Sequence, residues 1–222
     1  MNIQPLLLTL KLALITTFIL LIIGLPIAYF LAFSKFKLKF ILEALINTPL
    51  VLPPSVLGFY LLIAFNPNNY FAKFFKYYFD INLLFSFEGL VIGSIIFSLP
   101  FMVQHIQSGF QSLPISLKEA SYTLGKSELE TLFYVLIPNI KHSILSGIVL
   151  SFAHTIGEFG VVLMIGGNIP DKTKVASIAI YDEVEALNYS LAHFYSLVML
   201  ITSILLLSLV YFINNKYNIK KS

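Results

Sequence analysis

Five long apolar segments constrain this chain more than any other feature of its sequence. A helix needs roughly 20 largely apolar residues to cross a bilayer core about 30 Å thick. The segments run from Leu12 to Phe33, Asn47 to Phe65, Gly89 to Phe110, Ile144 to Gly167 and Phe194 to Ile213. They predict an all-α, polytopic membrane protein with about five transmembrane helices in a single domain, residues 1–222.

The composition agrees with a membrane protein and argues against several functions. Of the 222 residues, 58% are hydrophobic and 11% are charged, whereas a soluble domain carries about a quarter charged residues. The absence of cysteine excludes disulfides, thiolate zinc sites and cysteine nucleophiles. All basic residues are lysines, so the two-donor fork with which arginine binds nucleic acids is missing, and no nucleic-acid partner is expected. The few His, Asp and Glu residues favour a role other than catalysis.

The lysines predict the orientation of the chain in the membrane. No basic residue precedes Lys11 and no small-residue cleavage pattern follows the first apolar segment, so we expect that segment to be retained as a helix. One alternate set of connections holds nine lysines, at positions 35, 37, 39, 118, 126, 141, 216, 220 and 221, and the other holds four, at 73, 76, 172 and 174. The positive-inside rule then places the N-terminus outside and the C-terminus in the cytoplasm of a multi-pass cell-membrane protein. The aromatic-rich stretch 66–87 is expected to form a helix at the outer interface.

The cytoplasmic stretch 111–142 predicts a folded helical hairpin. Ser116 with Glu119, and Ser127 with Glu130, fit the pattern of a capping box at the start of each helix. Gly125 is a natural left-handed stop between the helices, and we expect Pro138 to mark the end of the second helix.

Each of these helices carries apolar residues at helical spacing. The first places Leu117, Ala120, Ser121 and Leu124 on one face, and the second places Leu129, Leu132, Phe133 and Leu136 on another. Such faces are buried in the membrane interface, against another protein or against the chain's own helices.

This hairpin resembles the EAA loop of ABC importer permeases. The loop's pattern is E-A-A, a glycine four residues after the second alanine, and an apolar pair that ends in proline. Its matches here are Glu119, Ala120, Ser121, Gly125, Val135, Ile137 and Pro138, with conservative departures at Ser121, Val135 and Ile137. The resemblance implies the type I ABC importer permease fold and a coupling helix seated in a cleft of a separate ATPase, in which the small Ser121 fits. The ATPase-coupling residues would be Glu119, Ala120, Ser121, Gly125 and Pro138.

The chain contains no G-x-x-x-x-G-K-[ST] phosphate loop. We therefore expect ATP and Mg²⁺ on the partner ATPase, and no cofactor in this chain.

The second apolar segment is interrupted by Pro49, Pro53 and Pro54. Proline removes an amide donor and disfavours helix just before it, so we expect regular helix only from about Pro54 onward. Ser55 to Phe65 spans roughly 17 Å as helix, which is too short to cross alone. The preceding backbone is therefore expected at membrane depth without helical hydrogen bonds, as in transport routes. The alternative is a structural helix with a proline kink.

Polar residues are scarce in the third and fourth segments. Ser98, Pro100, Gln104 and His105 predict a kink and polar groups in the third, with His105 bonded to a neighbouring carbonyl. In the fourth, His154 and Glu158 are spaced i, i+4 and so are expected on one helix face. Three roles remain open for Glu158: an ion pair, a bond to backbone at the turn 157–160, or a gate contact. With no evident third ligand, a metal site is not expected.

The motifs GEFG, GGNIPDKT and AIY between Gly157 and Tyr181 resemble the molybdate, tungstate and sulfate branch of these permeases. The run TPLVLPPSVLGFYLL resembles the molybdate and tungstate members more closely, and sulfate remains an alternative substrate. The resemblance implies a permease subunit of an ATP-driven oxyanion importer that works by alternating access. Its expected partners are a pair of ABC ATPase subunits, a second permease copy, an extracytoplasmic oxyanion-binding protein and the lipid bilayer.

No lysine is predicted deep in the membrane, and a deep cationic well would hold an anion instead of releasing it. We therefore expect a path or gate lined by hydroxyls, amides and backbone. The candidate residues are Pro53, Pro54, Ser55, Ser98, Gln104, Ser151, Thr155 and Glu158. Two other hypotheses stay open. One is a proton-coupled secondary transporter or channel that uses His154 and Glu158, and the other is a membrane scaffold without transport.

Overall fold

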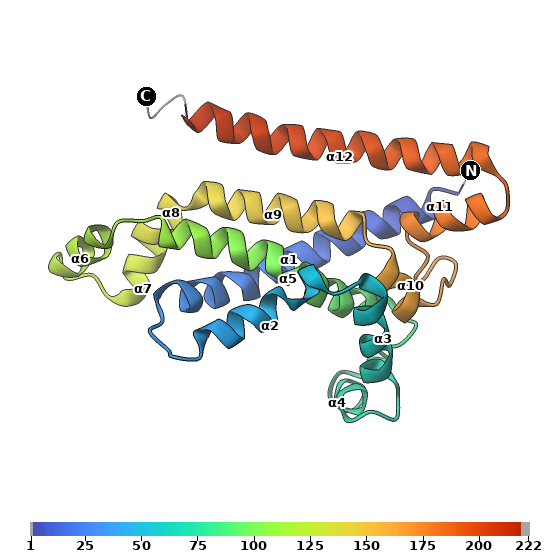
Figure 1. Cartoon of the computed structure of the whole chain (residues 1–222), viewed down its shortest axis with the longest axis horizontal. Helices are drawn as coiled ribbons and strands as arrows, with labels where there is room; N and C mark the ends of the chain where they lie inside the picture. The colour runs from blue at the N-terminus through green and yellow to red at the C-terminus, as the bar shows by residue number, and fades with distance from the viewer. Residues whose placement is uncertain (1, 219–222) are drawn as a thin grey trace.

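The computed structural model describes residues 2–218, and this part of the chain contains helices and no strands (Figure 1). The helices are α1 (Gln4–Phe33), α2 (Lys39–Val51), α3 (Pro54–Phe65), α4 (Tyr70–Phe79), α5 (Phe87–Gln111), α6 (Ile115–Thr123), α7 (Glu128–Thr131), α8 (Ile137–Asn139), α9 (Lys141–Ile156), α10 (Gly160–Gly166), α11 (Ala176–Glu185) and α12 (Tyr189–Asn218). A π-helical turn, Leu132–Leu136, joins α7 to α8. The prediction of an all-α fold is confirmed.

Three of the described helices, α1, α5 and α12, are long and apolar enough to cross a membrane by themselves. Two further crossings arise if each bent pair counts as one span. Helices α2 and α3 are bent by 112°, and the segment Glu128–Asn139 is bent by 73° from α9. The sequence prediction of about five spans is therefore met only when the bent pairs are included.

The helix boundaries differ from the predicted ones at several places. Helix α1 begins at Gln4, eight residues before the predicted Leu12, because Pro5 starts its first turn where no amide donor is needed. Helix α12 begins at Tyr189, and α11 was not predicted at all. The expected helix within 66–87 is α4, which Asn69 caps by accepting from the Phe71 amide at 3.0 Å.

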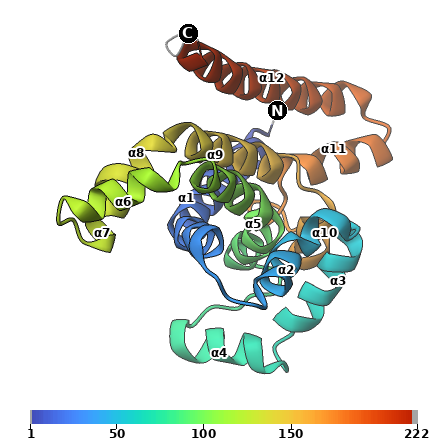
Figure 2. The same ribbon diagram turned by 60° about the vertical axis from the view of Figure 1, so that its left-hand side comes forward.

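Helices α1, α5 and α9 pack together (Figure 2), and the core consists of two apolar clusters. The first cluster contains Leu61, Phe65, Leu90 and Ile165, and the second contains Leu20, Met102 and Phe110. Small residues allow the close approach of these helices. A Cβ on Gly24 would lie 2.8 Å from the Met102 Cγ, and one on Gly147 would lie 3.2 Å from the Met102 Sδ.

We expected the backbone before Pro54 to be irregular, and this expectation was wrong. Helix α2 continues through Pro49 to Val51, and the backbone leaves helical geometry only at Leu52 and Pro53. Pro49 removes a single amide donor, and Pro54 opens α3 at a position whose amide would have no helical partner. The prolines therefore produce a sharp bend with very little irregular backbone.

The fourth predicted segment, Ile144 to Gly167, is also broken. Helix α9 ends at Ile156 and α10 begins at Gly160, so Gly157, Glu158 and Phe159 form the connection. A Cβ on Gly160 would lie 2.8 Å from the Cβ of Pro54, which starts α3. The break in the fourth segment thus packs directly against the break in the second.

The hairpin, residues 111–142, projects at one end of the bundle (Figures 1 and 2). The Ser127–Glu130 capping box is confirmed. The Ser116–Glu119 box was wrong, because the extended backbone of Pro114 already starts α6 at Ile115 and Ser116 lies inside the first turn. Gly125 has the predicted left-handed backbone, with φ of 77°. The second helix ends at Asn139, one residue after Pro138.

The lysines that determine the predicted orientation also separate in space. The first group belongs to α6, to the starts of α2 and α9 and to the connections beside them, at the hairpin end: Lys35, Lys37, Lys39, Lys118, Lys126 and Lys141. The second group belongs to α4 and to the connection between α10 and α11: Lys73, Lys76, Lys172 and Lys174. These two elements lie at the other end of the molecule, which we call the α4 end (Figure 1). Lys216 belongs to α12, while Lys220 and Lys221 lie outside the described residues.

Candidate functional site

The first candidate site is the surface of the hairpin. Glu119, Ala120, Gly125 and Pro138 are exposed there. Ser121 is buried, and its hydroxyl lies 2.8 Å from the Thr131 hydroxyl of α7. The small side chain that stands in place of alanine therefore joins the two halves of the hairpin instead of facing outward.

Large apolar side chains are exposed on the same hairpin. Leu124 is 82% exposed, and Leu129 and Phe133 are more than half exposed, whereas Leu132 and Leu136 are buried against the bundle. The predicted apolar face of the second helix is thus divided: half of it anchors the hairpin and half remains open. Exposed apolar side chains gathered on a projecting element are typical of a protein interaction site.

The hairpin is also attached to the end of α1. The Tyr29 hydroxyl donates to Glu128 Oε1 at 2.7 Å, and the Lys118 amine lies 4.5 Å from the centre of the Phe33 ring. These two contacts join the hairpin to helix α1.

The second candidate site is a buried polar cluster between α5 and α9. The Ser98 hydroxyl lies 3.0 Å from His154 Nδ1 and 3.0 Å from the Thr155 hydroxyl. Thr155 in turn donates to the Ser151 carbonyl at 2.9 Å. One turn away, the Ser94 hydroxyl donates to Glu158 Oε2 at 2.9 Å. Two serines of α5 thus hold the end of α9 and the break that follows it.

His154 and Glu158 do not share a helix face, so that expectation was wrong. Because α9 ends at Ile156, Glu158 lies in the connection to α10, and each side chain bonds to a different serine. Within residues 2–218, the Glu158 carboxylate forms neither of the two structural contacts expected for it, an ion pair or a bond to backbone. Instead, its carboxylate accepts from Ser94, and its main-chain carbonyl accepts from the Ser177 hydroxyl at 2.6 Å.

The residues predicted for a path fall into two groups and one separate residue. Ser98, Ser151, Thr155 and Glu158 are buried together, and among the described residues no hydrogen-bond partner is found for Ser151 Oγ or Glu158 Oε1. Pro53, Pro54 and Ser55 are exposed at the bend between α2 and α3. Gln104 lies elsewhere on α5 and donates to Asn47 Oδ1 of α2 at 2.7 Å. The role of these residues in a path stays a prediction.

Other polar positions complete the site. His105 Nδ1 lies 2.7 Å from the Phe101 carbonyl, which confirms its predicted backbone bond. Sequence reasoning missed Ser94, although its four-residue spacing from Ser98 places both on one face of α5. Within residues 2–218, no three side chains among His, Asp and Glu gather so as to hold a metal ion.

Comparison with known proteins identifies the class of protein to which this architecture belongs. Residues 24–220 match the family model "Binding-protein-dependent transport system inner membrane component", so the chain is a member of that family.

The chain is similar to individual curated members along most of its length. It is 43% identical over 204 residues to the molybdenum transport system permease protein ModB of Azotobacter vinelandii, covering 92% of this chain and 90% of that protein. It is 34% identical over 210 residues to the probable transport system permease protein NifC of Clostridium pasteurianum, covering 94% and 73%. Against the sulfate transport system permease protein CysT of Salmonella typhimurium, the identity is 33% over 186 residues, covering 84% and 67%.

Solved structures show the same fold at low sequence identity. A chain of the MetNI methionine ABC transporter in an inward-facing conformation superposes with a TM-score of 0.74 at 16% identity, covering 95% of this chain and 93% of that one. A chain of an amino acid ABC transporter gives a TM-score of 0.65 at 19% identity, covering 96% and 92%. The predicted type I ABC importer permease fold is confirmed.

Proposed function

We propose that this chain is the membrane-spanning permease subunit of an ATP-driven importer for molybdate or tungstate. We infer the substrate class from the 43% identity to a molybdenum permease over nine-tenths of both chains. The sulfate permease match is lower in identity and covers two thirds of that relative, so sulfate is the second choice.

The hairpin is the coupling element of this proposal. A pair of ABC ATPase subunits, which bind ATP and Mg²⁺, would press on its exposed residues Glu119, Leu124 and Phe133. The movement would reach α1 through the Tyr29–Glu128 bond and α9 through the 73° bend that follows α8. Helix α9 then carries the motion to Glu158 and to the junction of the two breaks.

Alternating access requires a path between subunits. Two copies of this chain would enclose it, since one copy offers a single hairpin and at most five crossings within its described residues. An extracytoplasmic binding protein would deliver the anion at the α4 end, with the N-terminus outside and the C-terminus in the cytoplasm of the inner membrane. The separation of the lysines between the two ends supports this orientation.

The proton-coupled alternative finds little support in the polar cluster. Direct proton transfer between His154 and Glu158 would need the two side chains in contact, whereas each bonds to its own serine. No second function is therefore advanced.

The decisive experiment is reconstitution of this chain in liposomes with its ATPase and binding protein. Uptake of radiolabelled molybdate is expected only with ATP, and excess unlabelled tungstate should compete for uptake more strongly than excess sulfate does. Uptake that is indifferent to ATP, or driven by a proton gradient without the ATPase, would refute the proposal.

A further inference from the structure

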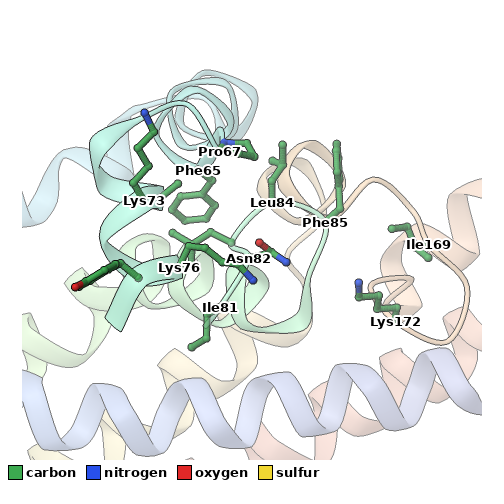
Figure 3. A pocket seen from close by; sticks show the side chains of 13 residues that line it. Phe65, Pro67, Lys73, Lys76, Ile81, Asn82, Leu84, Phe85, Ile169 and Lys172 are labelled. Carbon is green, nitrogen blue, oxygen red and sulfur yellow. The ribbon is translucent and has the colours of Figure 1, made fainter. Parts of the chain in front are cut away.

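A cavity of about 880 Å³ lies at the α4 end of the molecule (Figure 3). Helix α4 forms one side of it, the connection between α4 and α5 forms another, and the connection between α10 and α11 contributes Ile169 and Lys172. Neither the hairpin nor the buried polar cluster contributes a residue to its lining.

The lining combines an apolar wall with positive charge. Pro67, Leu84 and Phe85 form the exposed part of this wall, whereas Phe65 and Leu83 are each only 1% exposed. Lys73 and Lys76 come from α4 and Lys172 comes from the opposite side (Figure 3), and among the described residues no acidic side chain lines the cavity. Asp80, outside the lining, offsets part of this charge because its carboxylate lies 2.6 Å from the Lys76 amine.

The position of the cavity along the spans matches the level of lipid headgroups. Helix α3 ends at Phe65 and α5 begins at Phe87, and α4 lies between these two span ends. Tyr70 and Tyr77 of α4 are 90% and 83% exposed. Exposed aromatic side chains at the ends of membrane spans are typical of the interface between lipid and water. The lysines of the cavity therefore lie at the depth where phosphates of lipids occur.

The wall of the cavity has a shape fixed by unusual backbone. Phe85 has a positive φ of 57°, which is uncommon for a bulky residue, and its amide donates to the Ile165 carbonyl at 2.9 Å. Its ring lies over Gly167, where an added Cβ would come within 2.6 Å of the Phe85 Cδ1. Such strained positions persist only where the surroundings hold them, and they concentrate at ligand sites.

We propose that this cavity binds one anionic phospholipid from the leaflet at the α4 end. The lysine amines would take the headgroup phosphate, and the wall formed by Pro67, Leu84 and Phe85 would contact an acyl chain. A free tetrahedral anion shares the phosphate chemistry but would leave that apolar wall without a partner. The wall therefore favours a lipid over an anion in transit, and the assignment is independent of the transported substrate.

The absence of cysteine allows a site-specific test on the full chain. Asn68 is exposed and adjoins the lining residue Pro67, so Asn68→Cys would carry a fluorophore at the cavity mouth. Tyr189→Cys would carry it on α12, outside the cavity. In phosphatidylcholine nanodiscs, brominated phosphatidylglycerol is expected to quench the label at position 68 at a much lower mole fraction than brominated phosphatidylcholine does. At position 189 the two lipids should quench alike.

The role of the cavity lysines is tested with two double variants that each remove two positive charges. Lys73→Gln combined with Lys172→Gln should raise the mole fraction of brominated phosphatidylglycerol needed for half-maximal quenching about 25-fold. Each basic residue near a membrane surface contributes about fivefold to the affinity for an anionic lipid. Lys35→Gln combined with Lys37→Gln, which removes the same charge from exposed positions at the hairpin end, should leave that mole fraction unchanged.

Several outcomes would overturn the proposal. If the two brominated lipids quenched the label at position 68 equally in the protein with all its lysines, the proposal would be refuted. It would also be refuted if the two double lysine variants lost the same amount of phosphatidylglycerol-specific quenching. If millimolar inorganic phosphate or molybdate abolished the quenching by phosphatidylglycerol, the cavity would be a site for free anions instead of a lipid.

Discussion

The Ser94 hydroxyl donates a 2.9 Å hydrogen bond to Glu158 Oε2, joining α5 to the break between α9 and α10 across 64 positions of sequence. Both residues are buried, and no partner for the second carboxylate oxygen is found among the described residues. A single hydroxyl is thus the side-chain partner of the acidic group at the point where the broken helices meet.

Replacing Ser94 by alanine should destabilise the permease. The change leaves a buried carboxylate without its hydrogen bond, which costs about 1–3 kcal/mol. Thermal unfolding of the purified chain in detergent measures the loss. Ser116→Ala, at an exposed position of α6, is the control and should leave the midpoint unchanged. Glu158→Gln keeps an oxygen that accepts from Ser94 and should cost less than Ser94→Ala. Equal midpoints for Ser94→Ala and the wild type would contradict the assigned bond.

Glu158→Gln also separates the remaining roles of this residue in transport. Because glutamine conserves the shape and the bond to Ser94, we expect the variant to fold and to bind the ATPase normally. Molybdate uptake in proteoliposomes then reports on the charge alone. Full uptake would favour a structural role, and loss of uptake with normal folding would favour a gate.

The capping box formed by Ser127 and Glu130 in the hairpin should persist in acid. The Ser127 amide and the Lys126 amine hold the pKa of Glu130 at about 2, below its ordinary value of 4.5. A lowered pKa means that the carboxylate contributes stability above about pH 4.5 and that this contribution is lost as the pH falls through about 2. The ¹³C resonance of the Glu130 carboxylate measures the midpoint.

Removal of the neighbouring charge tests the cause of that shift. Lys126→Gln eliminates the 3.1 Å ion pair with Glu130 and should move the midpoint upward. Lys118→Gln removes a lysine that contacts Tyr29 and Phe33 instead, and should leave the midpoint in place. A midpoint near 4.5 in the wild type would show that the cap is not formed.

Reversing the charge of Glu119 should uncouple transport from ATP hydrolysis. Glu119 is exposed on α6, so Glu119→Lys should leave membrane insertion intact while weakening ATPase docking roughly tenfold, which corresponds to about 1.4 kcal/mol. Glu119→Gln removes the charge without reversing it and should show a smaller effect. Normal co-purification and full uptake by Glu119→Lys would refute the interface assignment.

Gly89 occupies a position where no side chain fits. A Cβ there would lie 1.7 Å from the Leu83 carbonyl oxygen, and backbone cannot move aside as a flexible side chain can. Gly89→Ala should therefore cost about 3 kcal/mol in stability. Gly157→Ala is the matched control, because its nearest neighbours would lie 3.8 Å away. Equal unfolding midpoints for the two variants would contradict the close packing of the loop before α5.

The sequence pattern correctly predicted those features that depend only on residues close together in the chain. The Ser127–Glu130 cap, the left-handed Gly125 and the His105–Phe101 bond depend on residues at most four positions apart, and each formed as expected. The Ser116 cap failed because Pro114 starts the helix earlier, a competition between neighbours that the capping pattern alone does not resolve. The pairing of His154 with Glu158 failed because the helix between them ends at Ile156.

The sequence by itself determined that this protein lies in a lipid bilayer, and it determined the class of protein to which the chain belongs. Long apolar segments require a membrane, and the residues of the hairpin carry the pattern of an ABC importer permease. Only the tertiary structure decided which polar groups meet. The pairing of Ser94 with Glu158, the packing of Gly160 on Pro54 and the gathering of three lysines around one cavity join segments far apart in the chain. Such contacts depend on how whole helices pack, and helical periodicity specifies a face of each helix without specifying its neighbour.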